Sequence, residues 1–366
     1  MTKIDFHTHV LPERVLGGAG SYGPEITIDK SGGKLRVGDV VKTINTVEGQ
    51  RLGLSQQVIA ERFVQQFSDP TVRIAEMDSK GIDAMVVTVH SRTYLYWAES
   101  EIAVPFAQLQ NESMAEYCAH APDRLFFLAT LPLQDIAASA HEAERAILKL
   151  GARGINVGAI NLGGHELDDD SLWPVYECIE RLHVPLFIHP YASEFSGAAS
   201  SHYSGGLLDL PYQETVAFTN LIYGGVLDEF PDLKIYLPHG GGFVPYQYGR
   251  IETFARIRKN VKAKRPVGDY LDNFYYDVLI HQRAARQYLV DWAGADHLVV
   301  GSNYGGDDSV DGFAFVHELG LPSVDQEKIF WRNAATLLNI TEPTGWRNSP
   351  EGVDVEAQAS DWRDNT

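Results

Sequence analysis

Cysteine is scarce in this chain: the 366 residues include only Cys118 and Cys178, both in stretches with helical patterns. Two cysteines do not make the disulfide framework typical of small secreted domains, so we expect reduced thiols and a cytoplasmic protein. The N-terminal sequence MTKIDFHTHV also lacks the apolar region of a signal peptide, which fits the same expectation.

Long hydrophobic runs and an excess of positive charge are missing as well. No apolar run in the sequence approaches the roughly 20 residues that a membrane-spanning helix needs. Lys and Arg number 30 against 49 Asp and Glu, which gives a formal net charge of −19. Because this charge repels polyanions, we expect neither nucleic acid nor a membrane as a partner. A small anionic substrate stays compatible, since a few local cations outweigh a distant negative field.

Short apolar, β-rich runs alternate with helical patterns along the chain. The runs occupy residues 3–9, 84–90, 125–132, 154–158, 185–190, 234–240, 274–281 and 297–303. Most are continuously apolar, as in parallel strands buried on both faces. Eight such units predict an α/β fold, a (β/α)8 TIM barrel, and 366 residues fit one barrel. A doubly wound open sheet is the alternative, but no Gly-rich phosphate loop follows the first run.

The predicted barrel has additions at both ends. We predict one domain over residues 1–340, with an insertion over residues 11–70 after the first strand, and a polar, acidic tail over residues 341–366. Glycine pairs and alternating residues in GGAGSYGPEITIDKSGGKLRVGDVV predict a small hairpin within the insertion. Because a segment after a barrel strand lies at the βα-loop face, we expect the insertion to cover the barrel mouth.

Histidines end several of the predicted strands. His7 and His9 are two residues apart, so in a strand both rings face the same side and reach one metal ion. His189 and His239 end the fifth and sixth strands, and Asn303 ends the eighth. An HxH pair alone is a weak signal, and a single strand-end histidine is more often a hydrogen-bonded core residue. The carboxyl ends of barrel strands converge, however, so the whole pattern predicts a metal site there.

Several motifs give the chain a family resemblance. They are DFHTHVLPE, DPTVRIAEMDSKGID, FIHP, LPHGGGFVPYQYGRI and GSNY. Together they resemble the amidohydrolase superfamily, in the branch of 2-amino-3-carboxymuconate-6-semialdehyde decarboxylase and related aromatic-acid decarboxylases. The resemblance runs from about Lys3 to Ile340, and it implies a distorted (β/α)8 barrel of the amidohydrolase type.

The same resemblance implies roles for individual residues. His7, His9 and His189 would bind one divalent metal ion, commonly zinc or manganese. His239 would act beside the metal as an acid or base. Arg250 corresponds to an arginine that helps to bind a substrate carboxylate, in some members across a dimer interface. A homodimer is therefore expected.

Asn303 departs from the family pattern, which has aspartate at this place. Asparagine still offers a carbonyl oxygen to a metal, but it cannot serve as a base at neutral pH. Either the aspartate was replaced by an experimenter, or the asparagine is native to a divergent member. The loop GGDD that follows, with Asp307 and Asp308, also differs from the family pattern, which favours a native asparagine.

His90 at the end of the second strand is a further departure. With His239 and Asp307 or Asp308 it suggests a second metal, as in the dinuclear iron or iron–manganese oxygenases that resemble this superfamily. A substrate contact, or a hydrogen bond to a ligand residue, is the simpler interpretation of His90. A solvated acidic loop is likewise an alternative interpretation of the Asp307–Asp308 pair.

Four residues are candidates for contacting a substrate. Arg92 and Trp97 follow the second strand, Tyr191 follows His189, and Arg250 is the residue that the resemblance indicates. The aromatic candidates equally suit a core or an interface.

The sequence thus predicts a metal-dependent enzyme that acts on a small carboxylated, aromatic or conjugated substrate. The expected reaction is non-oxidative decarboxylation, with His239 helping a proton to reach the ring carbon, or hydrolysis. A dinuclear oxygenase is the alternative. A weakly active subunit in a heterodimer with a paralogue is a third hypothesis, which Asn303 keeps open.

Overall fold

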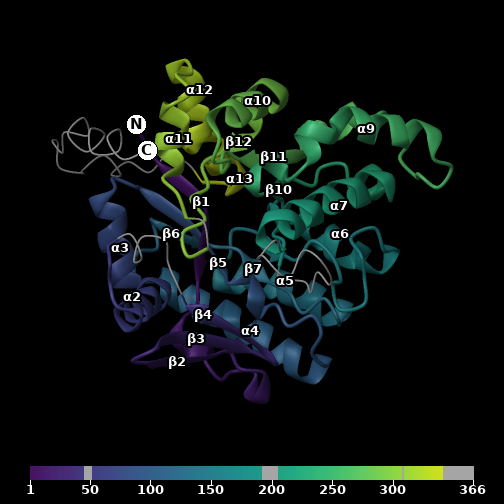
Figure 1. Ribbon diagram of the computed structural model, residues 1–366. Coiled ribbons are helices and arrows are strands. Elements are labelled where there is room, and N and C mark those ends of the chain that lie inside the picture. The colour runs from purple at the N-terminus through teal and green to yellow at the C-terminus, as the bar shows by residue number, and fades with distance from the viewer. Residues whose placement is uncertain (45–51, 192–204, 307–308, 341–366) are drawn as a thin grey trace.

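The computed structural model describes residues 1–44, 52–191, 205–306 and 309–340, and Figure 1 shows its ribbon. All eight predicted runs contain strands, and the third contains two short ones. The barrel strands are β1 (Ile4–Val10), β5 (Ala84–Val89), β6 (Leu125–Phe127), β7 (Ala129–Thr130), β8 (Ile155–Val157), β9 (Leu186–Ile188), β10 (Ile235–Leu237), β11 (Phe274–Asp277) and β12 (Leu298–Val299).

These strands pair in parallel and in chain order. β1, β5 and β6 form one run of neighbours, and β7 to β12 form another. The runs join through Leu128, whose amide donates to the Val87 carbonyl at 3.1 Å, and they close where Phe6 N donates to the Val300 carbonyl at 2.8 Å. The sheet is therefore a closed, distorted (β/α)8 barrel, as predicted.

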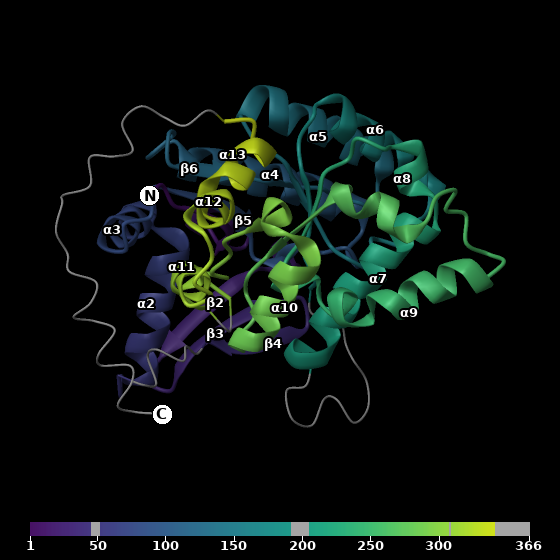
Figure 2. The same cartoon turned by 90° about the horizontal axis from the view of Figure 1, so that it is seen from above.

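Helices surround the strands, as the view from above shows (Figure 2). They are α2 (Gln56–Ser68), α3 (Pro70–Ser79), α4 (Ser100–Cys118), α5 (Ile136–Leu150), α6 (Trp173–Arg181), α7 (Leu210–Tyr223), α8 (Val226–Glu229), α9 (Val244–Ile257), α10 (Arg283–Ala293), α11 (Gly312–His317), α12 (Ser323–Glu327) and α13 (Asn333–Leu337). Local chemistry sets their ends. The Asp135 side chain accepts from Ala138 N before α5, and Gly151 ends that helix at φ 80°.

The segment after β1 forms a small antiparallel sheet of β2 (Glu25–Asp29), β3 (Gly32–Val37) and β4 (Val40–Ile44). The predicted hairpin is present, with a third strand added. Figure 1 shows this sheet at the end of the molecule toward which β1 runs. The domain boundaries stay a prediction, and the tail over residues 341–366 lies outside the described residues.

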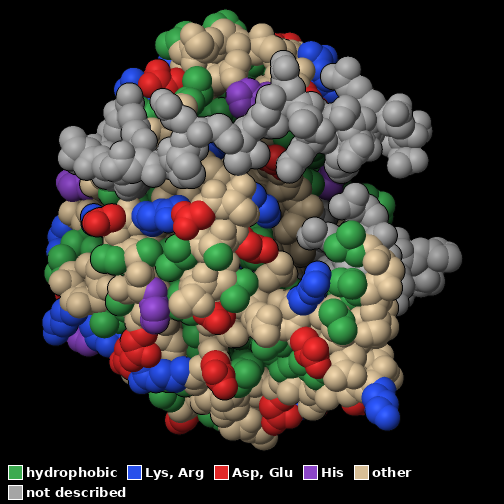
Figure 3. All heavy atoms as spheres, turned by 90° about the vertical axis from the view of Figure 1, so that its left-hand side faces the viewer, with side chains coloured by type: hydrophobic (Ala, Val, Ile, Leu, Met, Phe, Trp, Pro, Cys, Tyr) green, Lys and Arg blue, Asp and Glu red, His purple; other side chains and the backbone are tan. Residues whose placement is uncertain are grey.

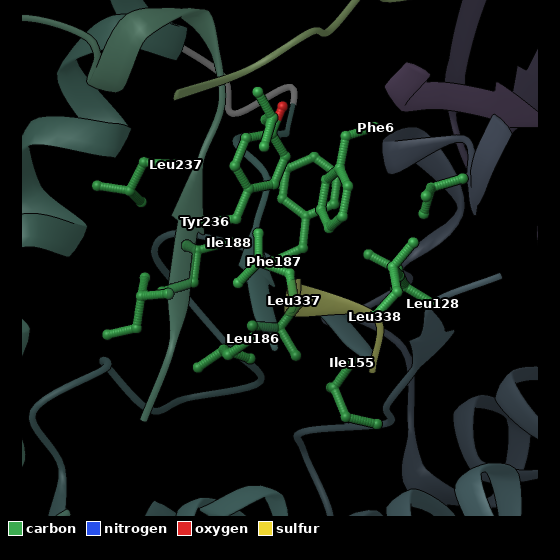
Figure 4. Packing of buried hydrophobic residues seen from close by; sticks show 14 of the residues in the cluster. Phe6, Leu128, Ile155, Leu186, Phe187, Ile188, Tyr236, Leu237, Leu337 and Leu338 are labelled. Carbon is green, nitrogen blue, oxygen red and sulfur yellow. The ribbon is translucent and has the colours of Figure 1, made fainter. Parts of the chain in front are cut away.

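Aromatic rings from three barrel strands meet in the interior. Phe6, Phe187 and Tyr236 are completely buried, and Figure 4 shows them pointing toward one another. The Tyr236 ring lies 5.0 Å from Phe6 and 4.5 Å from Phe187 between centroids. The barrel is therefore a packed core, on which side chains at its carboxyl end rest.

The described residues contain no helix that is both long and apolar enough to cross a bilayer. Cys118 and Cys178 are free thiols, and both are buried.

On the face in Figure 3, acidic and basic side chains lie interspersed with apolar ones. The described part of that face therefore has no large area of one charge.

Candidate metal centre and active site

His7 and His9 come from β1, which is not a regular strand. Its register against β5 shifts between Asp5 and Thr8. His189 follows β9, and its ring centroid lies 5.1 Å from that of His7 and 4.8 Å from that of His9. One ring nitrogen of each histidine lies within 4.8 Å of the other two, and all three residues are buried. The structure thus groups the three histidines that the sequence singled out.

Each of these histidines places its Nδ1 atom against an acceptor of the protein. The pairs are His7 with Asp277 Oδ2 at 3.0 Å, His9 with Thr88 Oγ1 at 2.9 Å and His189 with the Pro190 carbonyl at 2.5 Å. The Thr88 hydroxyl donates its own proton to the Thr8 carbonyl at 3.2 Å, so it accepts from His9. All three Nδ1 atoms therefore carry protons, and all three Nε2 atoms present lone pairs.

The Nε2 lone pairs face other acceptors. His7 Nε2 lies 3.1 Å from His189 Nε2, and His9 Nε2 lies 3.1 Å from Asn303 Oδ1. Acceptors at this distance repel each other unless a cation lies among them. Two ligands of one ion, with bonds of about 2.0–2.2 Å, have about this spacing. The donor set of three imidazoles and one amide oxygen therefore fits a divalent cation.

Burial keeps the imidazoles in the form that coordinates a metal. Desolvation is the main cause that lowers the pKa of His9 to about 4, and charge repulsion from His239 adds to it. Desolvation also lowers the pKa of His189 well below its ordinary value, and charge repulsion from His9 and His7 follows. Because the rings of His9 and His189 are neutral at neutral pH, a cation need not displace protons from them to bind.

His239 follows β10 and faces the same group of rings. Its centroid lies 5.2 Å from that of His7 and 5.7 Å from that of His189. Its Nδ1 lies 2.5 Å from Oε1 of Glu214, a fully buried side chain of α7, while the His239 side chain stays 13% exposed. The carboxylate orients the ring by binding its Nδ1 atom. Nothing in LPYQETVAF distinguishes Glu214, so sequence reasoning missed it.

The backbone at two strand ends is unusual. His239 has φ 49° and Asn303 has φ 50°, a left-handed conformation that is uncommon outside glycine. Gly242 lets Glu214 come close, because a Cβ there would lie 2.2 Å from the Pro211 carbonyl oxygen and 2.9 Å from Glu214 Oε2. The HGGG sequence therefore serves the approach of α7 to His239.

Asp277 at the end of β11 is a second residue that sequence reasoning missed. Besides His7, it accepts from the Tyr236 hydroxyl at 2.7 Å, Gly240 N at 3.2 Å and Leu279 N at 3.1 Å. Burial raises the pKa of Asp277, and these hydrogen bonds act in the opposite direction. The only signal in the sequence was one acidic residue within the otherwise apolar run FYYDVLIH.

Asn303 is held through the residues on both sides of it. Ser302 donates from its amide and its hydroxyl to the Asp5 carboxylate, whose pKa burial raises to about 6. The Arg73 guanidinium, also buried, stacks on the Tyr304 ring at 3.9 Å from its centroid. These contacts fix the carboxyl end of the eighth strand against the first, which brings Asn303 to the histidines.

His90 lies near the cluster, with its ring centroid 6.0 Å from that of His9. Its Nδ1 accepts from Arg92 N at 3.2 Å, and burial lowers its pKa well below the ordinary value. Nε2 therefore carries the proton of the neutral ring and acts as a donor, not a ligand. Within the described residues, the three clustered histidines are the one group suited to a metal ion. Asp307 and Asp308 lie outside those residues.

Two of the predicted substrate contacts follow strand-end histidines closely in the chain. Arg92 stands two residues after His90, and its backbone amide donates to the Nδ1 atom of that ring at 3.2 Å. Tyr191 stands two residues after His189, and its hydroxyl donates to the Asn161 carbonyl at 3.0 Å. Both residues are only partly exposed.

The other two predicted contacts lie at the surface. Trp97 is 56% exposed and packs on Tyr22, 4.8 Å away between centroids. Arg250 is exposed on α9, where its guanidinium covers the Phe254 ring at 4.9 Å. Within this chain, therefore, the structure does not bring either residue to the histidines.

The barrel with histidines at its strand ends agrees with what comparison with known proteins shows. The model of the amidohydrolase family matches residues 4–340, and the chain belongs to this family. The chain is 30% identical over 311 residues to 2-amino-3-carboxymuconate-6-semialdehyde decarboxylase of Dictyostelium discoideum, which covers 82% of this chain and 81% of that protein. The predicted branch of the superfamily is thereby confirmed.

Two further relatives extend this comparison. The chain is 28% identical over 284 residues to gamma-resorcylate decarboxylase of a Polaromonas species, over 73% of this chain and 86% of that protein. A solved dihydroxybenzoic acid decarboxylase from Polaromonas, with bound manganese and the inhibitor 2-nitroresorcinol, superimposes with a TM-score of 0.74 at 23% identity. It covers 93% of this chain and 98% of that one, and it confirms the fold.

Proposed function

We propose that this chain is a metal-dependent carbon–carbon lyase that removes carbon dioxide from a small carboxylated aromatic or conjugated substrate. The group of three buried histidines, with Nε2 lone pairs facing one spot beside His239 and Glu214, carries the proposal. The reaction class is supported by relatives named as decarboxylases of carboxylated substrates.

His7, His9, His189 and the amide oxygen of Asn303 would hold one divalent metal ion, zinc or manganese. When bound, the ion supplies a Lewis acid and a template for substrate oxygens. Imidazole nitrogens with one amide oxygen suit either metal, and a solved relative carries manganese.

His239 handles the proton in this proposal. Glu214 accepts a hydrogen bond from the Nδ1 proton, and its negative charge favours the doubly protonated ring. In that form Nε2 carries a second proton, which it would deliver to the substrate, leaving the neutral ring. The proton goes to the carbon that bears the carboxylate. The bond between that carbon and the carboxyl carbon then breaks, its electron pair returns to the conjugated system, and carbon dioxide leaves.

Charged and covering residues complete the proposed site. Arg92, whose amide donates to His90, would attract the substrate carboxylate. The insertion would cover the barrel mouth, and one contact supports this role. Phe67 at the end of α2 lies 5.9 Å from His90 between centroids. Two buried free thiols agree with the proposed cytoplasmic location.

A homodimer is part of the proposal, formed through a groove between α7 and α9. The groove has a volume of about 780 Å³, and Arg250 lies in it with apolar side chains that include Phe243, Ile251 and Phe254. Tyr246 on its rim is 83% exposed. An aromatic side chain this exposed beside an apolar groove is typical of a protein interface. In a dimer Arg250 would leave solvent, as the resemblance implies for a substrate-binding arginine.

Hydrolysis would use the same single metal, whereas the dinuclear oxygenase would need two. The role of His90 Nε2 as a donor argues for one metal. A heterodimer with a paralogue would show itself as a second chain after purification from the native source.

The proposal is tested by metal analysis together with carbon dioxide release. We expect one zinc or manganese ion per chain and release from gamma-resorcylate or the carboxymuconate semialdehyde, abolished by chelation. His239→Ala should fold, keep its metal and lose about 10²-fold in kcat. Two metals per chain, or carbon dioxide release that survives chelation, would refute it.

A further inference from the structure

Arg73 on α3 is a completely buried, positively charged side chain beside the metal centre. Its Nη2 atom donates to the His9 carbonyl oxygen at 2.7 Å. The face of its guanidinium lies on the Tyr304 ring, 3.9 Å from the centroid, and Tyr304 directly follows Asn303 in the chain. One side chain thus contacts the backbone of one proposed ligand and the residue next to another.

The same guanidinium reaches the insertion over residues 11–70. Its Nη2 atom also donates to the Gln66 carbonyl oxygen at 3.2 Å, in the last turn of α2. The next residue, Phe67, is buried, and its carbonyl oxygen accepts from Leu11 N at 3.1 Å. A Cβ on Gly305 would lie 2.5 Å from the Phe67 ring, so glycine is what lets this ring approach. The end of α2 therefore packs against the carboxyl ends of both the first and the eighth strand.

The charge of Arg73 does not explain its place. A buried cation repels a metal ion bound nearby, and moving it out of water is itself costly. Charge alone would therefore favour a neutral side chain here. What arginine offers instead is a planar group that donates to two carbonyl oxygens while its face stacks on a ring. The geometry of the guanidinium, and not its charge, suits the metal centre.

We propose that Arg73 is a positioning residue that links the metal centre to the insertion. It holds the backbone at His9 and at the Asn303–Tyr304 turn in the arrangement that a metal ion needs, through the same nitrogen that holds the end of α2. Coupling between linked sites is reciprocal. An ion that fixes His9 and Asn303 therefore also stabilises α2, and a well-packed α2 raises the affinity for the ion. This inference rests on the metal centre of the proposed function.

Arg286 on α10 provides a matched control. It is almost completely buried, and it stacks on the Phe315 ring at 3.9 Å from the centroid. It also donates to two backbone carbonyl oxygens, that of Ile280 at 2.7 Å and that of His281 at 3.1 Å. Among the described residues it makes no hydrogen bond to the clustered histidines or to Asn303. Loss of either arginine should therefore destabilise the fold, but only loss of Arg73 should weaken the metal centre.

The manganese affinity of the full chain, measured by competition with a chelator, is the first test. We expect Arg73→Gln to bind manganese about tenfold or more weakly than the parent, although this substitution removes a repelling charge. Arg73→Lys, which keeps the charge but not the planar fork, should also weaken binding. Arg286→Gln should match the parent in affinity while it loses stability in denaturant unfolding. Unchanged or tighter binding in Arg73→Gln overturns the inference.

Hydrogen exchange in the parent chain tests the link to the insertion and needs no variant. Manganese should slow amide exchange in α2 about fivefold or more beyond its effect in α5, a helix that packs against α4 and α6. Arg73→Lys should remove that difference between the two helices. Equal slowing of α2 and α5 in the parent overturns the inference, even where no Arg73 variant folds.

Carbon dioxide release, measured separately, distinguishes this inference from the lyase proposal. Manganese that binds and selectively slows exchange in α2 without carbon dioxide release keeps the role of Arg73 and removes the reaction. Carbon dioxide release with equal slowing of α2 and α5 keeps the lyase and removes the role of Arg73. A parent chain that binds no manganese removes both.

Discussion

At the scale of single residues, the site is organised by what the Nδ1 atoms bind. A carboxylate, a hydroxyl and a carbonyl hold the three clustered histidines, and a second carboxylate holds His239. These partners fix each tautomer before any ion arrives, which reduces the ordering that binding requires. Substitutions at the partners should therefore weaken metal binding or turnover without removing a ligand.

The double variant His7→Ala, His9→Ala removes two of the three imidazoles. It should lose stoichiometric zinc or manganese while keeping a folded barrel, because one histidine and an amide oxygen hold a divalent ion weakly. Metal analysis after dialysis, with circular dichroism for the fold, measures this. His165→Ala, a surface histidine paired with Asp169, is the control. Full metal retention in the double variant would exclude these ligands.

Asp277→Asn keeps the size of the side chain but removes the charge that holds His7 Nδ1. We expect the affinity for manganese to fall by about 10- to 100-fold. Competition with a chelator of known affinity measures the change. Asp272→Asn, at an exposed position in the turn before β11, should have no effect. Equal affinities for both variants would show that Asp277 does not support the site.

Asn303→Asp adds one negative ligand to an otherwise neutral set. Metal affinity should rise by about tenfold or more, because charge attraction is strong in a buried site. If asparagine is the native residue, activity should not rise, since the added charge weakens the Lewis acid for which the site is built. Affinity and kcat measured beside the parent decide this. A large gain in kcat would mean that aspartate is the working residue here.

At the scale of elements, α7 and the loop after β10 depend on each other. Gly242→Ala would place a Cβ against the Pro211 carbonyl at φ 64°. We expect a loss of at least about 1–2 kcal/mol in the free energy of unfolding and a lower kcat, as Glu214 moves from His239. Gly249→Ala on α9 meets no atom within 4 Å and should be neutral or slightly stabilising. Denaturant unfolding and steady-state kinetics test both variants.

The elements also show which features the sequence can predict. Buried parallel strands are continuous apolar runs, so all eight strands and the histidines at their ends were predictable. The hydrogen-bond partners of the histidines were not predictable. Asp277, the partner of His7, lies 270 residues away in the chain, and Glu214, the partner of His239, lies on a helix whose sequence does not distinguish it. The register shift in β1 likewise depends on pairing with β5. Distances of this kind follow from closing the barrel and are not encoded in any local pattern.

At the scale of the whole molecule, the exposed rim of the groove between α7 and α9 should decide the oligomeric state. Tyr246→Glu puts a charge at the proposed interface and should convert the dimer to a monomer of 40.6 kDa. Light scattering at micromolar concentration measures this. Leu148→Glu on α5, which is 62% exposed outside the groove, is the matched control. A parent that is already monomeric would contradict the dimer.

The first and eighth strands both supply residues to the site, so the site is completed late in the synthesis of the chain. His9 and Asn303 meet across 294 residues. At translation speeds of about 5–20 residues per second, the histidines of β1 leave the ribosome about 15–60 s before Asn303 does. Until then β1 has no eighth strand to pair with, and a metal ion would find an incomplete set of ligands. The finished centre can therefore appear only after Asn303 has been synthesised, which makes metal content a measure of how many chains have closed their barrel.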